Sequence, residues 1–453
     1  MTRSPAAEHP TLWSRARSMA MKAPPERNRY VDFLRAFSIL AVVVGHWLVA
    51  APYVSDGAVE GGHLLGILPW TRWLTWGFQV MPIFFLVGGF SNHASWSANR
   101  RDGGTYAEWF TGRLQRLVNP VLPLFLIWTV FAMFGTAMGV DRDIVKMAAQ
   151  LALIPVWFLA VYLIVASVVP FTHAAWRRYG LASFWALAAG AAAVDTASLA
   201  LHVPYVNFLN FAFVWLAVHQ LGYAWSEGRF TPFRALAWGA GGLVALGLLI
   251  GFGPYPVAMI GVPGEPLSNS MPPTIALLAL GIAQTGFALA LEPWARRVLA
   301  GLRLWTGVVL INGMIMTVYL WHLTAFVGVM VAAWLLGGVG LHEMPGSGAW
   351  WLARPVWFAL YIAALLPLIA VFARFERPGS IAGLPDAPPI PHWRLIAGLL
   401  LISAGLAASA VFSIASPEGI TGVRLWIVAM PFLGAALVRF GPVYGLARRS
   451  QIR

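Results

Sequence analysis

The sequence lacks cysteine altogether, and only 10% of its 453 residues are charged. The missing cysteine excludes disulfide bonds, thiolate nucleophiles and metal sites held by thiolates. Hydrophobic residues make up 59% of the chain, whereas an ordinary soluble domain has about 25% charged residues and a smaller apolar share. These features exclude a soluble globular domain and indicate a chain that lies largely within a lipid bilayer.

Apolar runs, each near the length of about 20 residues that a helix needs to cross a membrane, follow one another along the chain. They cover residues 31–52, 73–95, 117–138, 150–172, 181–201, 206–226, 235–254, 272–292, 306–336, 354–373, 395–415 and 424–441. The sequence therefore predicts an all-α, polytopic membrane protein with about twelve transmembrane helices.

Basic residues outnumber acidic ones by 30 to 17, which gives a formal net charge of +13. They are unevenly placed, because with the N-terminus inside, the expected outer segments hold only Arg72, Arg142, Lys146, Arg354 and Arg424. Such an excess of arginine and lysine on one side is typical of cytoplasmic segments. The charge thus predicts cytoplasmic termini and contact with membrane lipid, with no nucleic-acid partner, in a multi-pass protein of the cell (plasma) membrane.

The first apolar run carries three ionisable side chains, which are costly inside a membrane. Asp32 and Arg35 are one helical turn apart near its inner end. The step from Arg35 to His46 returns the helix to nearly the same azimuth and rises by about 16 Å. Because lipid would not tolerate such a polar stripe, we expect it to face a functional site inside the bundle.

A pair of arginines enters the third run from its inner side. Arg113 and Arg116 are one helical turn apart, and paired guanidinium groups at this spacing suit phosphate oxygens. The alternative is that they are ordinary anchors at the inner membrane face.

The ninth run contains Asn312, Tyr319 and His322, whose spacing predicts one broad helical face. Both the first and the ninth runs start on the inner side, and His46 and His322 each lie about fifteen residues later. At about 1.5 Å per residue, the two imidazoles should lie at a similar depth past the membrane midplane. We expect them to face one shared cavity, although a lone buried histidine is often only structural.

These patterns, taken together, resemble the integral-membrane O-acyltransferases of acyltransferase family 3. The resemblance covers roughly residues 27–376 and rests on five short motifs in order: Arg35-x10-His46 preceded by YVDFL, PIFFLVGGFS at 82–91, Arg113-x-x-Arg116 followed by Pro120, PVWFL at 155–159 and VYLWH at 318–322. The chain departs from the family at Gly88-Gly89, where relatives often have Ser-Gly. Adjacent glycines also permit a neighbouring helix to approach closely.

The resemblance implies a ten-helix core that takes an acyl group from cytoplasmic acyl-CoA, with acetyl-CoA as the first expectation, and places it on a hydroxyl, usually of a sugar. It gives the following divisions: a cytoplasmic tail at 1–29, the acyltransferase core at 30–376, a Pro-rich cytoplasmic linker at 377–394, two additional transmembrane helices at 395–441 and a basic tail at 442–453. No metal is expected.

Acyl transfer needs a hydroxyl that is deprotonated as it attacks, and a neutral imidazole suits that task near neutral pH. His46 is therefore expected to act as general base or, alternatively, as a transient acyl carrier. Arg35, held by Asp32, would orient the donor or stabilise the developing charge on the thioester oxygen. His322 and Tyr319 would complete the catalytic site, and Arg113 and Arg116, with Arg35, would bind the donor.

Two other functions fit some of the same residues. A secondary transporter of a small polar solute also has about twelve spans, with ionisable groups inside the membrane. Its usual two-half symmetry is not evident in this sequence. A haem protein could use His46 and His322 as axial ligands.

Overall fold

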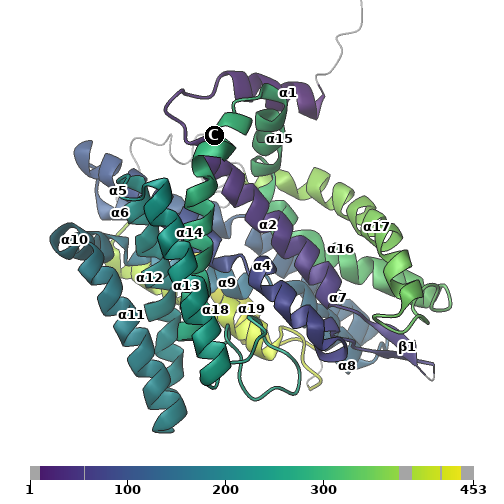
Figure 1. The fold of residues 1–453 in the computed structure, drawn as a ribbon. Helices are drawn as coiled ribbons and strands as arrows, with labels where there is room; N and C mark the ends of the chain where they lie inside the picture. The colour runs from purple at the N-terminus through teal and green to yellow at the C-terminus, as the bar shows by residue number, and fades with distance from the viewer. Residues whose placement is uncertain (1–10, 56, 377–389, 419–420, 440–453) are drawn as a thin grey trace, which may run out of the picture.

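The computed structural model describes residues 11–55, 57–376, 390–418 and 421–439, which form a bundle of helices with one small hairpin (Figure 1). The helices are α1 (Leu12–Met21), α2 (Arg29–Val49), α3 (Leu64–Ile67), α4 (Thr75–Phe78), α5 (Met81–Arg101), α6 (Tyr106–Val118), α7 (Val121–Ala137), α8 (Arg142–Leu153), α9 (Val156–Ser167), α10 (Val169–Tyr179), α11 (Leu181–Asp195), α12 (Asn210–Ser226), α13 (Pro232–Phe252), α14 (Ile275–Val298), α15 (Leu302–Asn312), α16 (Ile315–Leu335), α17 (Gly348–Phe372), α18 (His392–Phe412) and α19 (Leu425–Leu437). Short helical turns are η1 (Pro69–Leu74), η2 (Thr196–Ala200), η3 (Val206–Leu209) and η4 (Ala373–Glu376). Strands β1 (Tyr53–Ser55) and β2 (Ala58–Glu60) pair antiparallel.

The number of membrane spans is close to the predicted number. Nine segments of the described residues are long and apolar enough to cross a membrane, or ten if the bent pair α8 and α9 forms one span. The polytopic all-α fold is therefore confirmed, but the count of twelve is not reached. The reason is length, because the predicted runs 206–226 and 424–441 form helices of 17 and 13 residues, α12 and α19.

The ninth predicted run is not one helix, which corrects the expectation of one shared face. Helix α15 ends at Asn312, and α16 begins at Ile315 after a break at Gly313 and Met314. Met314 has φ −134° and ψ 17°, which lies outside the helical region, and glycine has low helix propensity. Asn312 is therefore on a different helix from Tyr319 and His322, and its side chain donates hydrogen bonds to the carbonyls of Asp32 and Val308.

The close approach that the adjacent glycines predict occurs between α5 and α12. A Cβ atom on Gly89 would lie 1.9 Å from the carbonyl oxygen of His219, and one on Gly222 would lie 2.2 Å from that of Leu86. Only glycine fits at such a backbone contact. The crossing fixes the position of α5, which carries several polar residues of the site described below.

The ends of the chain extend the bundle. Helix α1 packs on α15 at one end of the molecule (Figure 1), and Trp305 donates a hydrogen bond to the carbonyl of Ala20. Helices α18 and α19 pair with each other, and α18 packs against α8 and α9. Parts of three predicted segments lie outside the described residues: residues 1–10 of the N-terminal tail, residues 377–389 of the Pro-rich linker and the whole basic tail 442–453.

Candidate active site

Two histidines from distant parts of the sequence meet in the bundle. His46 lies in the last turn of α2, and His322 lies in the first half of α16. The Nδ1 atom of His46 is 2.8 Å from the Nε2 atom of His322, and their rings stack with centroids 5.1 Å apart. The two imidazoles, predicted to share one depth, are thus in direct contact, although α16 starts later in the chain than the predicted run.

The surroundings of His322 determine which nitrogen carries each proton. Its Nδ1 atom lies 2.6 Å from the carbonyl oxygen of Tyr319. A carbonyl can only accept a hydrogen bond, so Nδ1 of His322 carries the proton and Nε2 of the neutral ring is an acceptor. Nδ1 of His46 must then be the donor of the bond between the rings. The remaining nitrogen, Nε2 of His46, is left as the basic atom of the pair.

The two imidazoles differ in exposure. His322 is fully buried, whereas His46 is partly exposed. Nε2 of His46 makes no hydrogen bond to any described residue. The atom is not fully buried, so it is open to a ligand. The arrangement therefore presents one accessible base, oriented by a buried second imidazole and a carbonyl.

Neighbouring residues hold this pair in place. The indole of Trp47 donates a hydrogen bond of 3.1 Å to the carbonyl of His322. The hydroxyl of Tyr319 donates to the carbonyl of Pro155, at the break between α8 and α9, at 2.7 Å. Tyr319 thus contacts His322 through its backbone carbonyl, while its side chain anchors α16 to the neighbouring helix.

Near the other end of α2, a carboxylate lies between two arginines. Asp32 is 3.5 Å from Arg35 and 2.6 Å from Arg27, and its side chain is only 8% exposed. Asn28 caps the start of α2 by accepting from the amides of Tyr30 and Val31, which places Asp32 in the first turn. The ion pair with Asp32 raises the pKa of Arg27, which precedes the membrane-spanning part of α2. Arg27 could not be singled out from the sequence, because it lies in a polar tail outside the apolar run.

Helix α5 connects Arg35 to Arg113. Arg35 donates to the hydroxyl of Ser91 at 3.2 Å, and Arg113 donates to the carbonyl of the same residue at 3.3 Å and to the hydroxyl of Ser95. Arg116 is exposed at the last turn of α6, and its charge acts on both Arg35 and Arg113. Four arginines from three segments therefore gather near one end of α2.

A second carboxylate borders this cluster and was not predicted. Glu376 accepts a hydrogen bond from the amide of Thr317 at the start of α16, and it interacts electrostatically with Arg116. A carboxylate is favourable at a helix N-terminus. The signal that could have identified Glu376 and Ser91 is spatial, because neither lies at a helical spacing from the predicted site residues.

The geometry does not fit a metal between the two histidines. Two imidazole nitrogens on opposite sides of one metal would be about 4 Å apart, given metal–nitrogen bonds of about 2.0–2.1 Å. The facing nitrogens of His46 and His322 are 2.8 Å apart and share a proton. In the described part of the chain, no group of three or more His, Asp or Glu residues could hold a metal ion.

The comparison with known proteins gives one match. A family model described as an acyltransferase domain, that of acyltransferase family 3, matches residues 28–374. No curated protein and no solved structure matches the chain. The matched region contains both histidines and the arginines Arg35, Arg113 and Arg116, whereas Arg27 lies just before it; the match ends before α18.

Proposed function

The chain belongs to acyltransferase family 3 and is an acyltransferase of the membrane; on this premise, we propose that it moves an acyl group from cytoplasmic acyl-CoA to a hydroxyl. Acetyl-CoA is the proposed donor, and the proposed acceptor is a carbohydrate or glycolipid at the cell (plasma) membrane. The observation that carries this proposal is the oriented, accessible nitrogen Nε2 of His46, on the helix that also carries the arginine-bound Asp32.

In the proposed reaction, Nε2 of His46 takes the proton of the acceptor hydroxyl as its oxygen attacks the thioester carbonyl. A carbon–oxygen bond forms and the carbon–sulfur bond breaks. The proton then passes from the imidazolium to the leaving thiolate, so the products are an ester and a thiol. The bond from Nδ1 of His46 to His322 keeps Nε2 free for both proton transfers.

His322 and Tyr319 have positioning roles in this proposal. The carbonyl of Tyr319 fixes the tautomer of His322, and His322 fixes that of His46. While His46 holds the extra proton, the charge can be shared with Nε2 of His322, because the two nitrogens face each other. The ion pair with Asp32 fixes the direction in which the guanidinium of Arg35 points.

The arginine cluster has the chemistry to bind the phosphates of the donor. Arg113 is half-buried and fixed by Ser91 and Ser95, whereas Arg116 is exposed and free to turn toward a ligand. Guanidinium groups bind phosphate in a bidentate manner. The rise of about 16 Å along α2 between Arg35 and His46 suits a donor whose phosphates and reactive carbonyl are separated by an extended arm.

Residues 30–376 form the proposed catalytic core, and α18 and α19 are an addition to it. They lie beyond the family match, yet Gln150 donates a hydrogen bond to the carbonyl of Ala410 and Gln115 donates to that of Val438. These bonds attach both helices to the core.

The proposal is tested with purified protein in proteoliposomes and a panel of labelled acyl-CoAs, supplied with soluble sugars or with membrane glycolipid. We expect label in an ester product and release of one thiol for each ester formed. Transport of solute without consumption of acyl-CoA, or no acyl transfer with any donor by well-folded protein, would contradict the proposal.

A further inference from the structure

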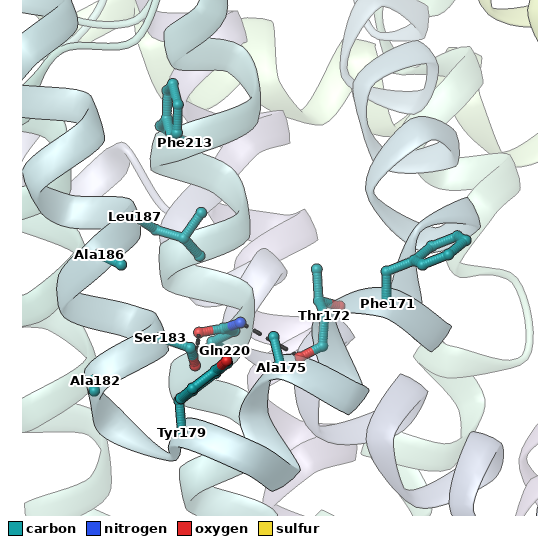
Figure 2. A pocket seen from close by; sticks show the side chains of 10 residues that line it. All are labelled: Phe171, Thr172, Ala175, Tyr179, Ala182, Ser183, Ala186, Leu187, Phe213 and Gln220. Atoms are coloured by element: carbon teal, nitrogen blue, oxygen red, sulfur yellow. Dashed lines mark hydrogen bonds between the residues drawn. The ribbon is translucent and has the colours of Figure 1, made fainter.

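A groove of about 590 Å³ lies on the flank of the bundle, away from the histidine pair, between α10, α11 and α12. Figure 2 shows its lining: Phe171, Thr172, Ala175, Tyr179, Ala182, Ser183, Ala186, Leu187, Phe213 and Gln220. Its rim is formed by exposed aromatic residues, since Phe171 is 77% and Tyr179 is 57% exposed. On the outside of a membrane-spanning bundle, such a groove faces lipid.

The groove runs from the turn between α10 and α11, where Tyr179 and Ser183 lie, toward Leu187 and Phe213 (Figure 2). Its exposed surface is apolar, because Ser183 and Gln220 are both buried and the hydroxyl of Ser183 donates to the side-chain oxygen of Gln220 at 2.9 Å. A charged group could therefore be bound only at the end of the groove, and not along its wall.

Two arginines lie near the end of the groove at the turn between α10 and α11. Arg178 is exposed in the last turn of α10, lies over the ring of Tyr179 and forms no ion pair with any described residue. The guanidinium of Arg229 lies beside Gly180, at the turn into α11, and is paired with Glu227. Two arginines against one glutamate leave this end positive, and the arginine distribution places it on the cytoplasmic side.

We propose that this groove binds one anionic phospholipid of the cytoplasmic leaflet, with an acyl chain along Ala186 and Leu187 and the phosphate at Arg178 and Arg229. Two features agree with this occupant: the exposed apolar wall and the arginines at the end of the groove. Basic pockets between transmembrane helices on the cytoplasmic side bind anionic headgroups. This inference is independent of the proposed transfer reaction.

The test uses the full chain in detergent, incubated with equal amounts of 1-palmitoyl-2-oleoyl phosphatidylglycerol and phosphatidylcholine and then analysed by native mass spectrometry. We expect one phosphatidylglycerol to be retained at least about fivefold more often than phosphatidylcholine. Ala186→Trp fills the groove from its exposed wall and should abolish this retention. The matched control Ala189→Trp, on the same helix, also exposed and outside the groove, should keep it.

A double variant, Arg178→Gln with Arg229→Gln, separates the headgroup from the chain. It should still retain a lipid but lose most of the preference for phosphatidylglycerol, because one uncompensated arginine near the membrane surface contributes about fivefold. Arg234→Gln, which changes an exposed arginine on α13 outside the groove, should keep the preference. Equal retention of the two lipids by the wild type, or unchanged retention in Ala186→Trp, would overturn the proposal. So would a change of oligomeric state in Ala186→Trp without loss of lipid, because the groove would then be an interface between two copies of the chain.

Discussion

The role of His322 can be tested by substitutions that keep or remove its acceptor atom. In the structure, its Nε2 atom accepts the proton of Nδ1 of His46 at 2.8 Å, and its own position is fixed by the carbonyl of Tyr319. His322→Ala removes the acceptor. His322→Gln retains an oxygen that can accept the same proton. We expect the alanine variant to have a much lower kcat with little change in KM, and the glutamine variant to recover much of the loss.

The size of the loss can be bounded from two sides. A neutral hydrogen bond contributes about 0.5–1.5 kcal/mol, which corresponds to a loss of about two- to thirteenfold if only that bond matters. Loss of the correct histidine tautomer in a Ser-His-Asp triad costs about 10⁴-fold, but there the orienting group is a charged carboxylate. His322 is neutral, so we expect a value between these limits, near 10²-fold in kcat for His322→Ala.

The assay is thiol release from acyl-CoA in the presence of an acceptor, with thermal stability measured on each variant. His219→Gln is the control for burial, because His219 is equally buried and its side chain bonds to Asn92 and not to His46 or His322. A well-folded His322→Ala variant with wild-type kcat would refute the reasoning. A glutamine variant as slow as the alanine variant, at equal stability, would show that the acceptor atom is not what matters.

Other predictions concern donor binding, helix packing and pH. Arg113→Gln should raise the KM for acyl-CoA by about tenfold or more, because a hydrogen bond to a charged group contributes about 1.5–3 kcal/mol. Arg116→Gln should raise the KM less. Equal KM values for the wild type and both variants would count against the donor site. Gly89→Ala should lower the melting temperature by several degrees, since its Cβ would lie 1.9 Å from a backbone oxygen, whereas Gly307→Ala, with open space around it, should not. Burial lowers the pKa of His63, which directly precedes α3, so protonation favours the unfolded state and stability should fall as the pH drops below about 6.5. If His63→Asn shows the same loss between pH 7.5 and 5, this cause is wrong.

Much of the fold could be predicted from the sequence, because apolar length decides which segments cross a membrane. The contact between His46 and His322 was also predictable in outline, since buried ionisable groups must avoid lipid and both lie past the midplane of their runs. The break at Gly313 and Met314 could not be predicted in this way, because the apolar run continues through it without interruption. It moves Asn312 to α15 and leaves the pair intact.

The remaining features of the site depend on contacts between helices, which no spacing along one helix reveals. Ser91 joins Arg35 and Arg113 only because α5 lies between α2 and α6 in this region. Arg27 reaches Asp32 from a polar segment that precedes the first span. Tyr319 was expected in the catalytic site without a defined role; its carbonyl makes the contact with His322, and its hydroxyl bonds to the carbonyl of Pro155.

The most direct test of the central claim is a single-turnover reaction of the wild type and of His46→Ala with radiolabelled acetyl-CoA, in proteoliposomes that contain the acceptor. We expect the wild type to label the acceptor with no label on the protein at any time in the turnover, and His46→Ala to be inserted normally but at least about 10²-fold slower, as loss of a general base requires. Label trapped on His46 would assign it the role of acyl carrier. Transfer by His46→Ala at the wild-type rate would contradict the account.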